Sequence, residues 1–297
     1  MRIALLGTRG PGFYGGFETC VAELAPRLAA RGHEVTVYAR SWSESRHWRH
    51  EGVRVVSIPS VRTKNLDTIT HSALCAVHAM TANRPDVAAV FGVGNAMFAR
   101  SLRAARVPTV LNVDGLDRQR AKWGRFARWW LSRSERWAIP AATVLVTDAH
   151  SIKKYYSDCY GADSTFIPYG APDGPVTGTD EITGRGLVPG GYVLYVSRLE
   201  PENNAHIALE AYASSGITLP FVVVGGAAYG SNYESSLHEL ATDGVVFCGF
   251  VFGEGYRQLQ SHACVYLQCT EVGGTHPALI EAMAYGNAVV ALDTREH

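Results

Sequence analysis

Short apolar runs alternate with helical patterns along the whole chain, and this alternation limits the fold more than any other feature. Each run is three to six residues long and is bounded by glycine, proline or polar residues. Strands that alternate with helices form parallel sheets with crossover helices, so the pattern predicts an α/β fold. The predicted strands are Arg2–Leu6, Glu34–Tyr38, Val53–Ile58, Val87–Phe91, Thr109–Asn112, Thr143–Thr147, Tyr192–Val196, Phe221–Val224, Val245–Phe247, Val265–Gln268 and Ala288–Leu292.

A segment rich in turn-forming residues divides the pattern into two halves. From Pro168 to Gly178 the chain reads PYGAPDGPVTG, with few apolar residues, which is typical of a linker. A chain of 297 residues suits two domains of about 150 residues each. We predict a first domain at 1–168, a linker at 169–186 and a second domain at 187–297.

Composition excludes several classes of function. The formal net charge is zero, so no general affinity for nucleic acid is expected. The apolar run Ile3–Leu6 is too short for a signal peptide, and no run approaches the roughly 20 apolar residues of a membrane span. Six cysteines are scattered without a C-x-x-C pair, which favours free thiols in a reducing cytoplasm over disulfides or zinc.

Residues 262–293 carry the strongest functional signal. A strand ends near Cys269, a polar glycine-containing loop follows, and Pro277 stands at a plausible first helical position. A strand, a glycine loop and a helix N-terminus form the usual phosphate site of α/β proteins. Glu281, one turn into this helix, is placed for hydroxyl groups, so the segment predicts binding of a nucleotide.

A second glycine loop, GTRGPGFYGG, occupies Gly7 to Gly16 after the first strand. Gly15 and Gly16 at the helix start would allow close approach to an anion or a sugar, although a plain tight turn is the alternative. The loop lacks the G-x-G-x-x-G spacing, and the next strand ends in Tyr38-Ala39-Arg40 without an acidic residue. Both facts argue against a nicotinamide dinucleotide enzyme.

These two segments together resemble the family-four group of retaining GT-B glycosyltransferases, in a bacterial rhamnosyltransferase-like subgroup. The resemblance runs the whole length of the chain. It implies two Rossmann-like domains that face a cleft, with the nucleotide sugar in the second domain and the acceptor at the first. Relatives continue for several helices beyond the position of His297, so the resemblance implies a second domain that is incomplete at its C-terminus.

The resemblance also implies the chemistry. A sugar would pass with retention from a UDP-, dTDP- or GDP-sugar to a cell-surface polysaccharide or lipid-linked acceptor, without a cofactor. No metal is expected, because no Asp-x-Asp pair stands near a strand end and cationic side chains with a helix dipole would replace it.

Several residues match the family motifs and others depart from them. Arg198 matches the arginine that grips the donor diphosphate, whereas Asn203 stands where the family has a lysine. Glu281 matches the second glutamate of the Glu-x7-Glu motif, but the first position is Gly273. Glu271 substitutes for that glutamate only if the loop bends.

The remaining site residues follow from the same resemblance. Gly274, Thr275 and His276 would line the donor sugar and its phosphates. Asp114 follows a strand where many relatives have a nearby histidine, and it is expected to orient an acceptor hydroxyl. The predicted catalytic residues are Asp114, Arg198, Glu271 and His276; the predicted donor-binding residues are Gly15, Gly16, Arg198, Asn203, Gly274, Thr275 and Glu281.

Residues 118–137, RQRAKWGRFARWWLSRSERW, combine seven basic residues with four tryptophans. Trp123, Phe126, Trp130 and Trp137 fall near helical spacing, so we predict an amphipathic helix with a basic surface. Such a helix suits an anionic membrane or a lipid diphosphate. An ordinary helix that buries its tryptophans and exposes its arginines is equally compatible with the pattern.

Two alternatives of other classes remain open at this stage. A non-catalytic nucleotide-sugar-binding or membrane-associated module would fit the Asn203 and Gly273 replacements. A nucleotide-sugar epimerase would share the general fold type. The sequence does not decide the base, the sugar or the acceptor.

Overall fold

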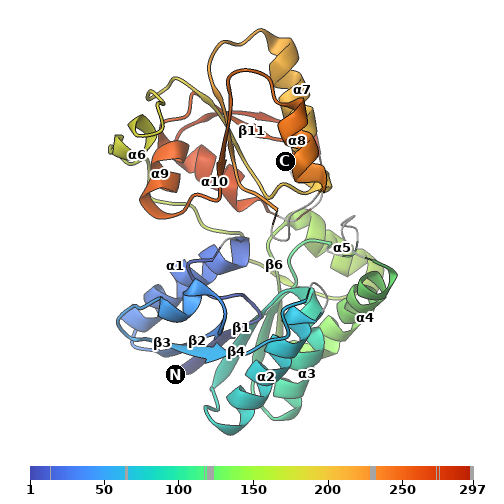
Figure 1. Cartoon of the computed structure of the whole chain (residues 1–297). Helices are drawn as coiled ribbons and strands as arrows, with labels where there is room; N and C mark the ends of the chain where they lie inside the picture. Colours follow the sequence, from blue (N-terminus) through green and yellow to red (C-terminus); the bar gives the residue numbers. More distant parts are fainter. Residues whose placement is uncertain are drawn as a thin grey trace. The chain divides into compact units, whose positions relative to one another are not determined.

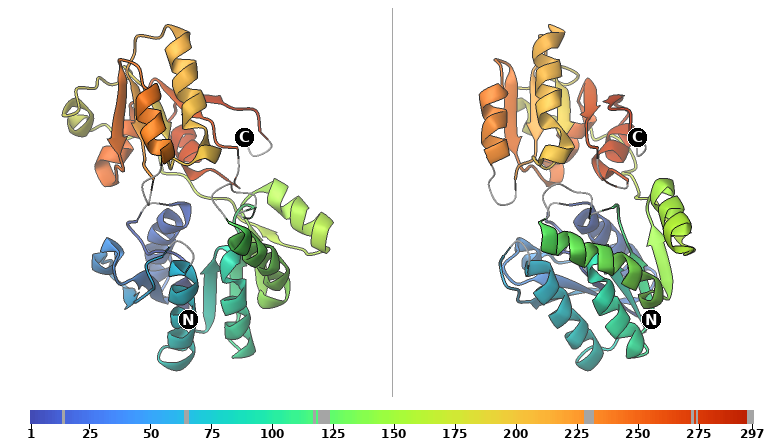
Figure 2. Two further views of the ribbon diagram at one scale, coloured as in Figure 1. Left: turned by 45° about the vertical axis from the view of Figure 1, so that its right-hand side comes forward. Right: turned by 90° about the vertical axis from the view of Figure 1, so that its right-hand side faces the viewer.

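The computed structural model describes residues 1–13, 15–63, 66–116, 118, 124–227, 232–271, 273 and 275–294. They divide into two compact units, one that ends at Pro168 and one that begins at Tyr169. Each unit contains a parallel sheet with helices on both faces (Figure 1 and Figure 2). The predicted α/β fold with two Rossmann-like domains is therefore confirmed.

The first unit is built on a seven-stranded sheet in the order β3-β2-β1-β4-β5-β6-β7, with every neighbouring pair parallel. Its strands are β1 (Arg2–Leu6), β2 (Glu34–Arg40), β3 (Val53–Ile58), β4 (Val87–Phe91), β5 (Thr109–Asn112), β6 (Val144–Thr147) and β7 (Thr165–Phe166). Its helices are α1 (Gly16–Ala30), α2 (Asp67–Thr81), α3 (Ala96–Ala104), α4 (Arg125–Ala141) and α5 (His150–Tyr160), with short 3₁₀ turns η1 (Glu44–His47) and η2 (Val93–Asn95).

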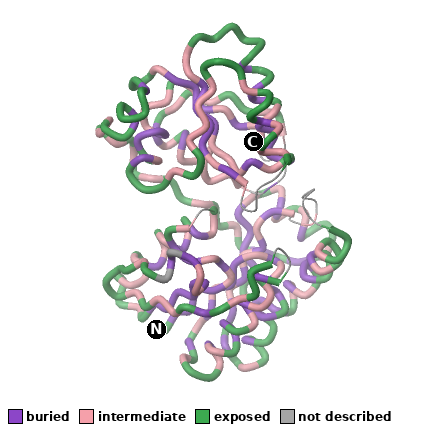
Figure 3. The backbone as a smooth tube through the Cα atoms, viewed as in Figure 1, coloured by how far each residue is buried: buried purple, intermediate pink, exposed green. Residues whose placement is uncertain are grey.

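Alternate residues of β1 supply the two faces of this sheet. Ala4 and Leu6 belong to the larger core, which also takes in residues of α2, α3, α4 and α5. Ile3 and Leu5 face the other way and pack with Val21 of α1. Because successive strand side chains point to opposite faces, a run that is apolar at every position marks a strand covered on both sides. Figure 3 shows the buried residues following the strands.

The second unit has a five-stranded parallel sheet in the order β10-β9-β8-β11-β12. Its strands are β8 (Val193–Val196), β9 (Phe221–Val224), β10 (Val245–Gly249), β11 (Val265–Gln268) and β12 (Ala288–Ala291). Its helices are α6 (Asp180–Thr183), α7 (Ala205–Ser215), α8 (Asn232–Leu240), α9 (Gly253–Ser261) and α10 (Pro277–Ala284), with the 3₁₀ turn η4 (Pro201–Asn203). Val193 and Tyr195 pack into the core that includes residues of α7 and α8, whereas Leu194 packs toward α9 and α10.

The basic helix differs from its prediction. Helix α4 begins at Arg125 rather than at residue 118, and it continues to Ala141. Arg118 is not part of a basic surface, because its Nε lies 3.1 Å from the buried carboxylate of Glu135 and its guanidinium donates to the Tyr155 hydroxyl. Residues 117 and 119–123, Trp123 included, lie outside the described part of the chain.

Two smaller differences have simple physical causes. Strand β7 is only two residues long, too short for an apolar run to announce it. Met283 lies in an apolar helical stretch, which predicts that it faces a core, but it is 55% exposed. Helix α10 turns one narrow stripe inward, formed by Ala278, Leu279 and the fully buried Ala282, so the residue next to Ala282 points outward.

Burial of a histidine in the first unit predicts acid sensitivity. His71 on α2 is fully buried, and burial lowers its pKa to about 4, with the nearby Arg40 acting in the same direction. The folded protein therefore holds a neutral imidazole, whereas the unfolded chain binds a proton near pH 6.5. This contribution to stability is complete above pH 6.5 and is lost as the pH falls toward 4.

We expect the free energy of unfolding, measured with urea, to fall by up to about 3 kcal/mol between pH 6.5 and 4 through this group alone. The variant His71→Gln should lose that part of the pH dependence. The matched variant His33→Gln, at a partly exposed histidine, should keep it. An unchanged pH profile in His71→Gln would show that the buried histidine is not the cause.

Candidate functional site

The order of the second sheet reverses between β8 and β11, and this point organises the candidate site. Loops after the carboxyl ends of strands on either side of such a reversal form the usual ligand crevice of open α/β sheets. Here they are residues 197–204 and 269–276. The Asn204 side-chain amide donates to the Cys269 carbonyl at 3.1 Å, and the Glu271 N–H donates to the Glu202 carbonyl at 3.0 Å. The two loops are thus joined directly.

The first of these loops carries Arg198, which is half-buried. The Arg198 carbonyl accepts a hydrogen bond from the Asn203 side-chain amide at 2.7 Å and one from the Glu200 N–H at 2.9 Å. Asn203 is only 3% exposed, and its own carbonyl accepts from the Tyr195 hydroxyl at 2.6 Å. Asn203 therefore holds the Arg198 loop from inside. Its direct contact with a donor stays a prediction.

The second loop leads into α10. His276 is the N-cap, and Pro277 takes the first helical position, as predicted. The N–H groups of Leu279 and Ile280 both donate to the His276 carbonyl, at 3.1 and 3.2 Å. Proline has no N–H, and the first-turn N–H groups of Leu279 and Ile280 are engaged by the N-cap carbonyl. The positive end of the α10 dipole still favours an anion near the loop before Pro277.

Glu281 on α10 is fixed by a residue of the neighbouring helix α9. The Tyr256 hydroxyl donates to Glu281 Oε2 and accepts from the Gln260 side-chain amide at 3.0 Å. Burial raises the pKa of Tyr256 well above its usual range, and the Glu281 charge adds to the effect. The phenol therefore stays protonated and keeps donating, which holds the Glu281 carboxylate in one orientation.

A side chain at position 273, eight residues before Glu281, would meet the imidazole of His276. A Cβ atom built on Gly273 would lie 2.7 Å from Cε1 of His276. The imidazole thus occupies the space into which any side chain at position 273 would extend. Glu271 is exposed and Thr275 is half-buried, whereas Gly274 lies outside the described residues.

The first sheet reverses between β1 and β4, and its glycine loop lies at that point. The Asn95 side-chain amide donates to the Phe91 carbonyl at 2.7 Å and more weakly to the Gly7 carbonyl at 3.4 Å. These contacts join the loops that follow the two strands. The geometry places the GTRGPGFYGG loop at the carboxyl edge of the sheet, as its position after β1 predicted.

A side chain of the protein, Glu18, occupies the space next to Gly15. Glu18 Oε1 accepts the Arg9 N–H at 2.9 Å, and Glu18 is only 6% exposed. A Cβ on Gly15, whose φ is 137°, would lie 2.2 Å from Glu18 Oε2. The carboxylate folds back over the start of α1, where the helix dipole favours a negative charge. Contact of Gly15 and Gly16 with a ligand stays a prediction.

Asp114 follows β5 at the same edge of the first sheet. It adopts a left-handed backbone conformation with φ of 58°, and its N–H donates to Asn112 Oδ1 at 2.9 Å. Asn and Asp tolerate this conformation because short polar side chains bond to the local backbone. The residue is half-buried, so part of it is open to solvent.

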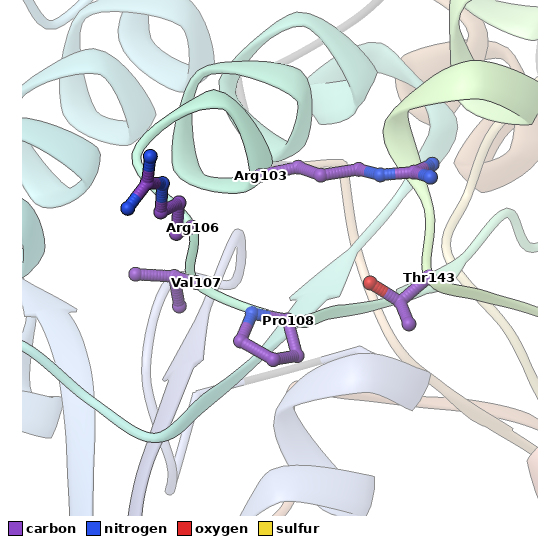
Figure 4. Close-up of a pocket in the computed structure, with 5 residues that line it drawn as sticks. All are labelled: Arg103, Arg106, Val107, Pro108 and Thr143. Atoms are coloured by element: carbon purple, nitrogen blue, oxygen red, sulfur yellow. The ribbon is translucent and has the colours of Figure 1, made fainter.

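Other possible sites are of a different kind. A shallow pocket of about 190 Å³ is lined by Arg103, Arg106, Val107, Pro108 and Thr143 (Figure 4). These residues precede β5 and β6, so the pocket lies at the amino edge of the sheet, opposite the loops above. In the described ranges, no three His, Cys, Asp or Glu side chains gather as a metal site would need. All six cysteines are free.

Sequence patterns did not single out Tyr256 or the Glu18–Arg9 contact. Tyr256 lies 25 residues before Glu281, and nothing in α9 marks it except that Gln260 follows one turn later. For Glu18, the sequence shows only an acidic residue in the first turn of the helix that begins at Gly16. An acidic residue in the first helical turn beside two glycines is the local signal that predicts a side chain turned back over the helix start, as Glu18 is here.

Comparison with known proteins gives two family matches. A glycosyl transferase 4-like domain matches residues 15–170, and a glycosyl transferases group 1 domain matches residues 190–297. No curated protein sequence matches the chain. The first match covers the chain from the end of the glycine loop through β7, and the second covers β8 to β12.

Solved structures share the fold at low identity. HepE from Anabaena, in complex with UDP and glucose, is 18% identical with a TM-score of 0.75 over 98% of this chain and 80% of that one. A sucrose-phosphate synthase from Thermosynechococcus elongatus is 21% identical with a TM-score of 0.77 over 98% and 80%. WaaG, a glycosyltransferase involved in lipopolysaccharide biosynthesis, is 16% identical with a TM-score of 0.72 over 98% and 80%.

The contact between Gly273 and His276 can be tested through stability. We expect Gly273→Ala to lower the free energy of unfolding by about 1–3 kcal/mol, because the new methyl group must displace the imidazole. In a His276→Ala background the same change should cost close to nothing. A double-mutant cycle in urea measures the difference. Equal costs in both backgrounds would contradict the contact.

Proposed function

The chain belongs to the glycosyl transferase 4-like family, and from this membership we propose that it transfers a sugar with retention, as in the rhamnosyltransferase-like subgroup. It is a glycosyltransferase with the GT-B fold that uses a nucleotide sugar. In this proposal residues 1–168 form the acceptor-side domain, 169–186 the linker and 187–297 the donor domain. The observation that best supports this proposal is the hydrogen bonding between the loops that follow β8 and β11.

Stabilisation of the leaving diphosphate is the main catalytic task. The acceptor hydroxyl oxygen forms a bond to the anomeric carbon of the sugar as the bond from that carbon to the diphosphate breaks. The diphosphate departs with the electron pair, and the hydroxyl proton passes to a departing phosphate oxygen. Arg198 faces this charge as a bidentate donor, and the loop amides before Pro277 supply further N–H groups. Both lie at the carboxyl edge of one sheet, so the donor phosphates are proposed to bind between them.

Glu281 is proposed to receive the ribose hydroxyls. Its hydrogen bond from Tyr256 fixes the carboxylate before the ligand arrives, which lowers the cost of ordering on binding. His276 stands against Gly273, where the family motif has its first glutamate. We propose that the imidazole takes over the contact with the donor sugar, while Thr275, Gly274 and Glu271 line the same loop.

The donor is proposed to be a UDP-, dTDP- or GDP-sugar that binds without a metal ion or cofactor. One guanidinium, the loop amides and the positive end of α10 supply the compensating charge. The acceptor, a cell-surface polysaccharide or its lipid-linked precursor, would lie at the first domain. There Asp114 would orient its hydroxyl, and Gly15 and Gly16 would border it.

The donor assignment predicts a selective effect of Arg198→Ala. We expect the affinity for UDP, dTDP or GDP to fall about tenfold or more, because a charged hydrogen bond contributes about 1.5–3 kcal/mol. Affinity for the parent nucleoside should change far less. Thermal-shift titration identifies the nucleotide, since a ligand at 100 times its Kd adds about 2.7 kcal/mol of stability.

Arg257→Ala is the matched control, because this exposed arginine on α9 lies 3.8 Å from Glu254 in a surface ion pair. It should leave nucleotide affinity unchanged. If Arg198→Ala weakens the nucleoside as much as the nucleoside diphosphate, Arg198 does not contact the phosphates.

We also propose that α4 docks on an anionic membrane, where a lipid-linked acceptor would be found. Phe126 and Trp129 are 58% and 52% exposed, and their rings lie 5.9 Å apart. Four exposed basic residues accompany them: Arg125, Arg128, Arg133 and Arg136. Trp130 and Trp137 turn inward, and the Trp130 N–H donates to the Gly94 carbonyl at 3.1 Å. Basic and aromatic side chains thus share the outer face, as in interfacial helices.

In the described residues every helix is too short or too polar to cross a bilayer.

Vesicle co-sedimentation tests this docking. Each basic residue near an anionic surface contributes about 1 kcal/mol, so Arg125→Glu/Arg128→Glu should weaken binding at low salt by about thirtyfold or more. Binding of the unaltered chain should also fall steeply with added salt. Arg31→Glu/Arg54→Glu makes the same charge change elsewhere on the first unit and should bind like the unaltered chain. Equal binding by both double variants would rule out docking through α4.

A further inference from the structure

An arginine–aromatic cluster, defined as Arg9, Phe13, Trp42 and Arg62, lies beside the glycine loop of the first unit. Its members come from the loops after β1, β2 and β3, which are neighbours in the sheet order. All four therefore lie at the carboxyl edge, on the side of β1 away from Asp114. No role assigned above involves the side chains of these four residues.

The aromatic members form a fixed, partly exposed surface. The Phe13 and Trp42 rings meet edge to face with centroids 5.9 Å apart, and both residues are half-buried. The Trp42 indole N–H donates to Ser60 Oγ at 2.9 Å, and that hydroxyl donates in turn to Asp67. Half-exposed rings held in this way suit the apolar face of a sugar, with little side-chain entropy left to lose.

The charges around Trp42 are unbalanced. The guanidinium carbons of Arg62 and Arg40 lie 5.1 and 5.9 Å from the centroid of the same Trp42 ring. Arg40 is compensated, because its Nε lies 2.9 Å from Asp67 Oδ2 in a buried ion pair. Arg62 is exposed and, within the described ranges, has no acidic partner. In the described part of the chain, its guanidinium lies against the Trp42 indole ring.

A third guanidinium, that of Arg9, lies beside the other aromatic ring, and the backbone N–H of Arg9 donates to the Glu18 carboxylate. The guanidinium carbon of Arg9 lies 5.5 Å from the Phe13 centroid, so cationic groups flank both rings. Like charges near one another cost free energy unless an anion joins them. Guanidinium groups bind carboxylate and phosphate oxygens in a bidentate manner, and aromatic faces accept the sugar ring.

We propose that this cluster binds an anionic saccharide, with a carboxylate or phosphate group on Arg62 and the sugar ring against Trp42. The inference rests on the proposed transferase function, in which the bound saccharide is the acceptor or its nearest residue. Arg40 and Asp67 act as positioning residues. Their buried ion pair fixes Asp67, which accepts a hydrogen bond from the Ser60 hydroxyl that binds the Trp42 indole N–H. The acceptor of this chain is thus an acidic sugar.

Three sugars that differ only at C6 test the charge requirement: galactose, galacturonate and galactose 6-phosphate. Binding is followed by the indole N–H signals in nitrogen–proton NMR spectra of the full chain, with Trp42 assigned by Trp42→Phe. The two anionic sugars, or one of them, should shift the Trp42 signal at concentrations at which galactose leaves it unchanged. A response to one anion alone supports the cluster and identifies the group. Equal responses to all three sugars would overturn the proposal.

Arg62→Gln should raise the Kd of the anionic sugar about tenfold, because a charged hydrogen bond is lost. Arg62 is exposed, so the variant should fold normally. Arg31→Gln is the matched control, since this exposed arginine precedes β2 at the opposite edge of the sheet. Equal Kd values for the two variants would also overturn the proposal.

Nucleoside diphosphate binding, measured separately by thermal shift, distinguishes this proposal from the donor assignment. If anionic sugars bind through Arg62 and no nucleoside diphosphate binds, the donor assignment fails and the cluster stands. If nucleoside diphosphates bind but the sugars behave alike, the donor assignment stands and the cluster is not an acidic-sugar site.

Discussion

Two hydrogen bonds join the loops after β8 and β11, which form the candidate donor site. The Asn204 amide reaches the Cys269 carbonyl, and the Glu271 N–H reaches the Glu202 carbonyl. Arg198 precedes one of these contacts and the start of α10 follows the other. A guanidinium and a helix N-terminus are thereby held at the same edge of one sheet. Every role that we propose for the phosphates depends on this arrangement, because a misplaced charge stabilises a leaving group poorly.

Most of the architecture follows from local pattern. Apolar runs such as Phe221–Val224 and Val265–Gln268 define strands at the same residues in the structure. Pro277 begins α10, as a proline after a polar loop predicts. Parallel strand order then places loop residues such as Arg198 at the carboxyl edge without further information. Fold class and the location of the candidate site were therefore predictable.

Side-chain partners were not predictable, because they join residues far apart in the sequence. The pattern at 118–137 gave no sign that Arg118 turns inward to Glu135 and Tyr155, so the basic helix was expected to begin too early. The Tyr256 contact with Glu281 links two helices, and the Asn203 amide replaces a charge with a structural hydrogen bond. Such contacts depend on packing between elements, which local spacing does not encode.

A crystal structure with a bound nucleoside diphosphate tests the central claim most directly. The account predicts the terminal phosphate at hydrogen-bond distance, about 3 Å, from the Arg198 guanidinium and from amides of the loop before Pro277. It also predicts the ribose hydroxyls on the Glu281 carboxylate, with the Tyr256 contact intact. A nucleotide bound in the first unit, or at the amino edge of either sheet, would contradict the account.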